Sequence, residues 1–256
     1  MTEAPFPKES DLCAAFIAAL PDTWTAYAET GGFDILLVRK ADGMQIGVEA
    51  KLKLNAKVIC QAAEESRHYS VAGPNPDCRA VLVPEGGGSD LAGVCDLLGI
   101  TVIKMRHGAE AQYVSQLFWP PLPRLSEHYW EGEGWHERCP AKRITLPDWV
   151  PDVVAGDSAP VALTAWKIGA IKLVVTLDRR GYLTRADFAH FKVSMSRWTQ
   201  ERWLVKDGNG GWVRGPYMPD FKGQHPVNFD QIAADFEKWK SPESATQRGL
   251  FVGGAA

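Results

Sequence analysis

The stretch GFDILLVRKADGMQIGVEAK, residues 32–51, contains two apolar runs separated by a short turn. The first run carries Asp34 near its start, and the second ends on Glu49 and Lys51. Side chains two residues apart in a strand point to the same face, so Glu49 and Lys51 project together. A hairpin turn at 41–43 folds Asp34 back beside them. The stretch therefore predicts two carboxylates and a lysine on one face of a β-sheet.

Two carboxylates and a lysine are the side chains that metal-assisted cleavage of a phosphodiester needs. Carboxylates hold a hard divalent ion, which generates hydroxide and neutralises the charge that develops on the phosphate. One alternative is that these residues are ordinary solvated side chains on a sheet surface. Glu49 follows Val48 in an apolar strand, however, where an ionisable group is costly unless it is paired or metal-bound. A second alternative is a nuclease fold that has lost its activity.

Asp34 is followed by fourteen residues and then by Glu49-Ala50-Lys51, and this spacing resembles the motif of the PD-(D/E)XK, or restriction-endonuclease-like, nuclease superfamily. Phe33 replaces the proline of the family motif, and only the aspartate of that pair binds metal. The predicted order of a helix, three strands, a helix, a strand, a helix and a strand also matches the family core. The resemblance covers about residues 5–110. The flanking elements with the clearest patterns are helices over 8–20 and 56–71 and strands over 79–83 and 100–104.

The resemblance implies an α/β fold with a restriction-endonuclease-like mixed sheet flanked by helices, and a Mg²⁺- or Mn²⁺-dependent endonuclease. It implies that Lys51 positions the attacking water and that Gln61, on the second helix, orients the water or the phosphate. It also implies that Glu9, on the first helix, binds the metal directly or through water. The residues implied in catalysis are Asp34, Glu49, Lys51, Gln61 and Glu9, and those implied in metal binding are Asp34, Glu49, Glu9 and the Ala50 carbonyl.

Residues 160–216 have the pattern of three helices followed by a β-hairpin. Apolar residues recur with a period close to 3.6 over residues 161–177, which predicts the first helix. Glycines between two short apolar runs then predict the hairpin turn. The boundary signals are Gly181 after the first helix, a Thr184–Asp187 capping box, Ser194 as the cap of a helix reaching about Trp203, and Asp207-Gly208-Asn209-Gly210 in the hairpin.

This second pattern resembles a winged helix-turn-helix domain, a small α+β domain whose third helix enters the major groove of DNA while the hairpin follows the backbone. Residues 167–214 hold 10 Lys and Arg against 4 Asp and Glu, which favours DNA as the partner. Many winged helices bind protein instead, and that alternative stays open. The residues implied in DNA binding are Arg179, Arg180, Arg185, Lys192, Ser196, Arg197, Gln200, Lys206 and Arg214.

The 256 residues suit one or two domains. We predict a nuclease-like domain over 1–115, a Pro- and Trp-rich connector over 116–159 and a winged-helix-like domain with a C-terminal helix and tail over 160–256. Residues 1–110 carry a net charge of −5, whereas residues 159–256 carry +5. A carboxylate-rich part joined to a basic part fits a metal site coupled to a phosphate-binding module.

The five cysteines form no C-x-x-C pair, which predicts reduced thiols in the cytoplasm. No apolar run is long enough to cross a membrane, so a membrane partner is not expected. The sequence thus predicts a metal-dependent deoxyribonuclease. Two alternatives are a catalytically silent DNA-binding regulator or adaptor, and the nuclease subunit of a larger restriction, repair or transposition complex. A homodimer is a further expectation, because cutting both strands takes two active sites.

Overall fold

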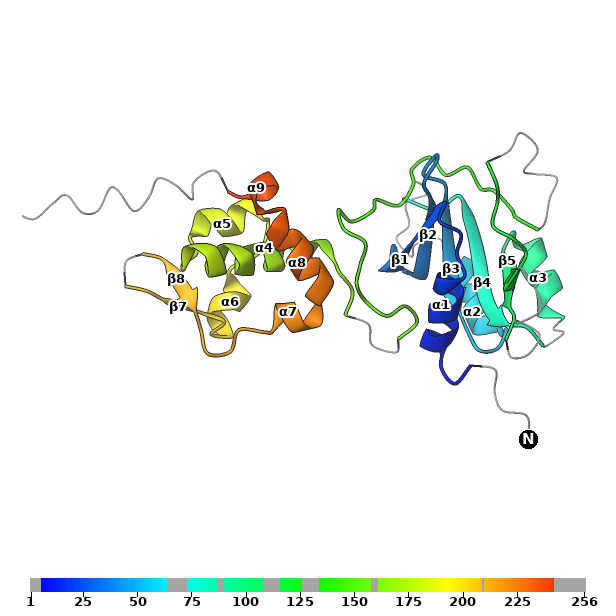
Figure 1. Ribbon diagram of the computed structural model, residues 1–256, viewed down its shortest axis with the longest axis horizontal. Helices are drawn as coiled ribbons and strands as arrows, with labels where there is room; N and C mark the ends of the chain where they lie inside the picture. Colours follow the sequence, from blue (N-terminus) through cyan, green and yellow to red (C-terminus); the bar gives the residue numbers. More distant parts are fainter. Residues whose placement is uncertain are drawn as a thin grey trace, which may run out of the picture. The chain divides into compact units, whose positions relative to one another are not determined.

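The computed structural model describes residues 6–63, 73–86, 90–107, 116–125, 134–157, 161–208 and 210–241. Its contacts divide the chain into two compact units, Met1–Ala162 and Leu163–Ala256. The first unit contains a six-stranded sheet flanked by helices, and the second contains a two-stranded hairpin among short helices (Figure 1). None of the helices within the described ranges has the length and apolar character needed to cross a membrane.

The first unit has the predicted order of elements, and β6 at its end is an additional strand. Residues 64–71 of the helix predicted over 56–71 lie outside the described residues. In chain order the elements are α1 (Glu9–Ala18), β1 (Trp24–Thr30), β2 (Phe33–Arg39), β3 (Gln45–Ala50), α2 (Ala56–Ala63), β4 (Cys78–Pro84), α3 (Leu91–Leu97), β5 (Thr101–Met105) and β6 (Phe118–Trp119).

The strands form one mixed sheet in the order β1-β2-β3-β4-β5-β6. The pairs β1–β2, β2–β3 and β5–β6 are antiparallel, and the pairs β3–β4 and β4–β5 are parallel. Parallel neighbours need a crossover connection, and α2 and α3 lie in those two connections. The chain is therefore α/β, as the sequence predicts, with the strands of the predicted motif near the middle of the sheet.

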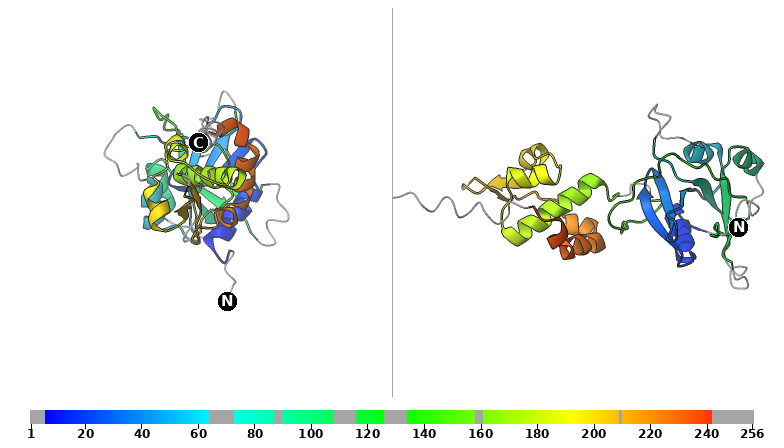
Figure 2. Two further views of the ribbon diagram at one scale, coloured as in Figure 1. Left: turned by 90° about the vertical axis from the view of Figure 1, so that its left-hand side faces the viewer. Right: turned by 90° about the horizontal axis from the view of Figure 1, so that it is seen from above.

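Helices cover both faces of this sheet: α1 lies on one face, and α2 and α3 lie on the other (Figure 2). Phe16 of α1 packs in a core with Ile35 and Val48. Val58 of α2 packs in a second core with Val81 of β4. Because both faces are covered, every residue of β3 is buried, including Glu49.

The segment after β6 packs on the first unit where it is described. Leu122 and Ile144 are buried, and the Trp135 indole donates a hydrogen bond to the Pro121 carbonyl oxygen at 2.7 Å. The Gln45 side chain of β3 exchanges hydrogen bonds of 2.8 and 2.9 Å with the backbone of Ile144. These contacts fix residues 134–157 against the sheet that carries the predicted motif.

The second unit begins with a 16-residue helix that packs against several short ones. Gly181 ends this helix at a φ of 84°, and Thr184 and Asp187 form the predicted capping box. In chain order the elements are α4 (Ala165–Arg180), α5 (Arg185–His190), α6 (Ser196–Gln200), β7 (Leu204–Lys206), β8 (Trp212–Arg214), α7 (Phe221–Gln224), α8 (Pro226–Ala234) and α9 (Phe236–Trp239).

Two boundaries differ from those that the sequence predicts. Thr164 caps α4, so this helix begins after the first apolar residues of the predicted period. The third helix, α6, has five residues, and its N-cap is Met195 instead of Ser194. Arg202 adopts a φ of 54°, which is incompatible with a continuing helix. The neighbouring Trp203 therefore turns into the core beside Phe221, with ring centroids 6.1 Å apart. Tertiary packing therefore shortens the helix that local propensity extends.

Candidate metal centre

The predicted catalytic side chains converge at one end of β2 and β3. Asp34, Glu49 and Gln61 line a pocket of about 290 Å³. Ile35 of β2 pairs with Val48 of β3, so Asp34 and Glu49 are the next residues along the two strands. Gln61, to which the family resemblance assigns a role at the site, lines the same pocket from α2. Three separate segments thus supply polar groups to one hollow beside largely buried strands.

Asp34 is held by the backbone of the neighbouring strand. Its Oδ2 accepts a hydrogen bond from the Ala50 amide at 2.8 Å. Burial raises the pKa of Asp34; the Ala50 amide and the Lys51 charge oppose this rise, and the Glu9 charge adds to it. The net pKa is raised, because burial outweighs the Ala50 hydrogen bond and the Lys51 charge. An oriented carboxylate in such surroundings is suited to bind a cation.

Lys51 lies directly after β3, and its ammonium group forms an ion pair with the Glu9 carboxylate of α1. Burial by itself lowers the pKa of Lys51. The hydrogen bond to Glu9 and the charges of Glu9, Asp34 and Glu49 outweigh burial and raise this pKa. The lysine is therefore held protonated beside the carboxylates, and Glu9 restricts its position.

Glu29, at the end of β1, is a site residue that the sequence analysis missed. It lines the same pocket, and burial is the largest cause that raises its pKa. Its φ of 50° lies in the left-handed region, which is uncommon for a residue other than glycine. The missed signal was the pair Gly31-Gly32, which forms the turn of a two-residue hairpin between β1 and β2. This turn brings Glu29 next to Asp34.

Gly156 closes one side of the site. Its amide donates a hydrogen bond to Glu29 Oε1 at 2.9 Å. Its φ is 70°, and a Cβ at this position would lie 2.8 Å from the Cys13 sulfur. Burial, followed by the charges of Asp34, Glu29 and Glu9, raises the pKa of Cys13 to about 12. The Cys13 thiol is therefore a packing group and not a nucleophile.

The donor set fits a hard divalent ion that retains part of its water shell. Among the described residues, no three His, Cys, Asp or Glu side chains form a group that could hold a metal by themselves. Mg²⁺ commonly takes one or two carboxylates and completes its octahedron with water and phosphate oxygens. Asp34 and Glu49 supply two carboxylates, whereas the Glu9 carboxylate is engaged with Lys51. A metal role for Glu9 and for the Ala50 carbonyl remains a prediction.

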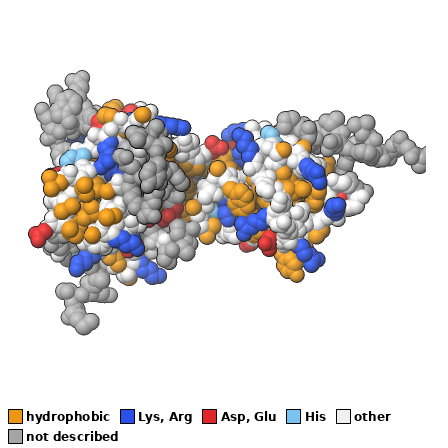
Figure 3. Space-filling model, turned by 180° about the vertical axis from the view of Figure 1, so that it is seen from behind, with side chains coloured by type: hydrophobic (Ala, Val, Ile, Leu, Met, Phe, Trp, Pro, Cys, Tyr) orange, Lys and Arg blue, Asp and Glu red, His pale blue; other side chains and the backbone are white. Residues whose placement is uncertain are grey.

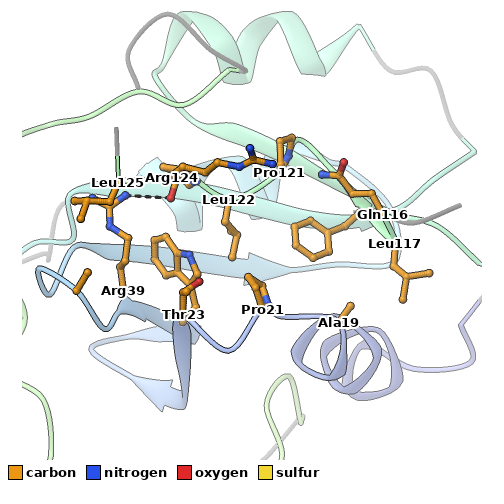
Figure 4. A pocket seen from close by; sticks show the side chains of 14 residues that line it. Ala19, Pro21, Thr23, Arg39, Gln116, Leu117, Pro121, Leu122, Arg124 and Leu125 are labelled. Carbon is orange, nitrogen blue, oxygen red and sulfur yellow. Dashed lines mark hydrogen bonds between the residues drawn. The ribbon is translucent and has the colours of Figure 1, made fainter. Parts of the chain in front are cut away.

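The opposite end of β1 and β2 is built differently. Trp24, Arg39, Phe118 and Leu122 line a larger and mainly apolar pocket of about 510 Å³ (Figure 4). Arg39 donates to both carboxylate oxygens of Asp42, at 2.8 and 2.6 Å. The hydrogen bond from Arg39 is the largest cause that lowers the pKa of Asp42 to about 2. The charges at this end stabilise each other.

Three of the arginines predicted to bind DNA make contacts within the second unit. Arg180 forms an ion pair with the buried Asp187, and Arg214 forms one with Asp178 at 2.6 Å. Arg179 donates to the Ala233 carbonyl oxygen at 2.8 Å. These contacts secure the C-terminal end of α4, so these three guanidinium groups have structural roles in addition to any contact with phosphate.

The other predicted DNA-binding residues are exposed. The Arg185 guanidinium lies 6.0 Å from the centroid of the Trp212 ring. On one face of the second unit, Lys and Arg side chains lie among hydrophobic side chains (Figure 3). The remaining exposed members of the predicted set are Lys192, Ser196, Arg197, Gln200 and Lys206.

Neither a model of a known protein family, nor a curated protein, nor a solved structure matches the chain.

Proposed function

We propose that this protein is a metal-dependent deoxyribonuclease of the PD-(D/E)XK type and that its second unit, acting as a winged helix, places it on DNA. The observation that carries the proposal is that Asp34 and Glu49 line one pocket and that the Lys51 ammonium lies close enough for both carboxylates to raise its pKa. Glu49 is only 6% exposed, and it lies opposite Asp34 in the register of β2 and β3.

The roles follow from the positions of the side chains. Asp34 and Glu49 would hold Mg²⁺ or Mn²⁺, and the Ala50 amide keeps Asp34 oriented toward that position. The bound ion would lower the pKa of a water ligand and neutralise charge on the phosphate. Lys51, held protonated, would orient the water and contact the scissile phosphate. Gln61 would donate a hydrogen bond to the water or the phosphate from α2.

A catalytically silent DNA-binding regulator or adaptor is the second candidate. Two observations favour it: the ion pair that occupies both Lys51 and Glu9, and the net charge of −5 over residues 1–110, which repels a polyanionic substrate. A nuclease subunit that needs a partner, or a homodimer, would show the same features when it is isolated. The presence of the partner, or of the second copy, would then reorganise the ion pair.

The deciding experiment is cleavage of labelled plasmid, linear duplex, single-stranded and branched DNA with Mg²⁺, Mn²⁺ or EDTA, for the wild type and Glu49→Gln. Metal-dependent cutting that the variant loses supports the nuclease. DNA binding that persists in EDTA, without cutting of any substrate, supports the silent regulator instead. If a protein that copurifies with the chain restores cutting, the chain is the nuclease subunit of a larger complex.

A further inference from the structure

One surface of the second unit gathers cations over aromatic rings. We call it the Lys167–Arg197 cluster, and it comprises Trp166, Lys167, Arg197, Trp203 and Phe221. The Lys167 ammonium lies 5.3 Å from the centroid of the Phe221 ring and 6.0 Å from that of Trp166. The Arg197 guanidinium lies 5.1 Å from the Trp203 centroid. Phe221 contacts both tryptophans, at 6.4 and 6.1 Å between centroids, so the cluster is continuous.

The two cations of the cluster differ from their neighbours in their partners. Arg180 and Arg214 have carboxylate partners at the C-terminal end of α4. Within the described part of the chain, no carboxylate forms an ion pair with Lys167 or with Arg197. Lys167 donates a hydrogen bond instead to the Gln224 amide oxygen at 2.6 Å. Burial, followed by the charge of Arg197, lowers the pKa of Lys167. Two like charges are thus held close together, an arrangement that an anion would stabilise.

The rings beside these cations differ in exposure. Trp166 is 37% exposed, whereas Trp203 and Phe221 are buried. Outside the cluster, Tyr217 is 62% exposed and lies 5.6 Å from the guanidinium of Arg202. Proteins that bind unpaired strands use cations to bind the backbone and aromatic rings to stack on the bases. The bases of a duplex are already stacked on one another, so they are not open to such a ring.

We propose that the Lys167–Arg197 cluster binds a backbone phosphate of an unpaired nucleic-acid strand, with Trp166 stacking on an adjacent base. This inference rests on the proposed nucleic-acid role of the second unit, and it specifies the substrate class as one with a single-stranded segment. It adds Lys167 and Trp166, which lie outside the DNA-binding set that the winged-helix resemblance implies.

The test measures binding of the full chain to fluorescent dT15 and to a 15-base-pair duplex in EDTA, between 50 and 200 mM salt. The variant is Lys167→Gln with Arg197→Gln. Its matched control, Lys238→Gln with Lys240→Gln, removes two charges that are paired on and beside α9. Thermal unfolding of each variant checks that it is folded. A third variant, Trp166→Leu, keeps an apolar side chain and removes the aromatic stacking surface.

We expect the cluster variant to bind dT15 at least about tenfold more weakly and its log–log salt slope to be shallower by about 0.7, the value for one single-strand phosphate contact. Trp166→Leu should weaken dT15 binding about tenfold without changing that slope. Binding of dT15 equal to that of the wild type, or an equal loss in the control, would overturn the inference. Metal-dependent cleavage by the wild type in that case would leave the proposed nuclease standing.

Variant-sensitive dT15 binding without any metal-dependent cleavage would support the inference and count against the nuclease. Loss of duplex binding alone would also overturn the inference, because the cluster would then recognise paired DNA.

Discussion

The two ends of the hairpin formed by β1 and β2 treat charge in opposite ways. At one end, Glu29 and Asp34 share a polar pocket, and burial raises the pKa of both carboxylates. At the other end, Asp42 is paired with Arg39, which lowers the pKa of Asp42 to about 2. The same two strands therefore carry one set of carboxylates that needs a cation and another that already has one.

This difference separates a candidate functional site from a structural ion pair. A protein gains stability from a paired carboxylate and loses it by crowding carboxylates together, so a crowded set indicates a function that offsets its cost. Pocket volume alone would select the wrong pocket as the candidate functional site, because the larger pocket lies at the end where Arg39 and Asp42 are paired. The chemistry of the lining residues identifies the site better than its size does.

The largest expected effect is on catalysis at the crowded end. Glu49→Gln should reduce the rate of Mg²⁺-dependent DNA cleavage about 100- to 1,000-fold, because it removes one of two carboxylates that would hold the ion. Binding of DNA in EDTA should stay within about twofold of the wild type. Asp42→Asn, at the paired end, is the control and should cleave normally. Equal rates for Glu49→Gln and the wild type would contradict the proposed site.

The next effect is on stability at the paired end. Asp42→Ala should lower the free energy of unfolding by about 2 kcal/mol at pH 7, because it leaves the buried Arg39 guanidinium without its charged partner. The pKa of Asp42 is lowered on folding, so its contribution is present above the ordinary aspartate pKa and is lost as the pH falls through about 2. Urea unfolding between pH 7 and pH 2 should show the free energies of unfolding of Asp42→Ala and the wild type approaching each other as the pH falls. Asp22→Ala, at an exposed position, is the control.

Gly156→Ala should have a smaller effect on stability, at a residue that donates a hydrogen bond to Glu29 of the candidate site. We expect a loss of about 1–2 kcal/mol in the free energy of unfolding, because the φ of 70° is strained for alanine and the new Cβ meets the Cys13 sulfur. Gly134→Ala is the matched control, since its φ is 75° but a Cβ there meets nothing within 4 Å. The difference between the losses in the free energy of unfolding at Gly156 and at Gly134 measures the contact of the new Cβ with the Cys13 sulfur. Equal losses would mean that the contact with Cys13 carries no energy.

The smallest expected effect has the opposite sign. Asp34→Asn should raise the free energy of unfolding of the metal-free protein by about 1 kcal/mol at pH 7, because it removes a buried charge while an amide oxygen can still accept from Ala50. Since the pKa of Asp34 is raised on folding, the wild type regains this stability as the pH falls through the raised pKa, and has regained it fully below the ordinary aspartate pKa. Unfolding in EDTA at pH 7 and pH 3 tests the sign, and destabilisation at pH 7 would contradict it.

Much of the first unit could be predicted because its signals are local. The apolar runs that contain Asp34 and Glu49 flank a turn with Gly43 at a φ of 71°, so the hairpin follows from the sequence. Glu29 escaped prediction because its importance depends on a second hairpin and on the distant Gly156. In the second unit, Gly181 and the Thr184 cap were predictable, whereas the short α6 was not.

The sequence by itself determined the order of the strands and helices of the first unit, the Asp34–Glu49 pairing and the hairpin of the second unit, because periodicity, turn glycines and caps act over a few residues. Only the tertiary structure decided which carboxylates are crowded and which are neutralised, and that Lys51 contacts Glu9. It also decided that Lys167 and Arg197 lie close enough to repel each other. Burial and the distance between charges depend on segments far apart in the chain, and no local pattern records them.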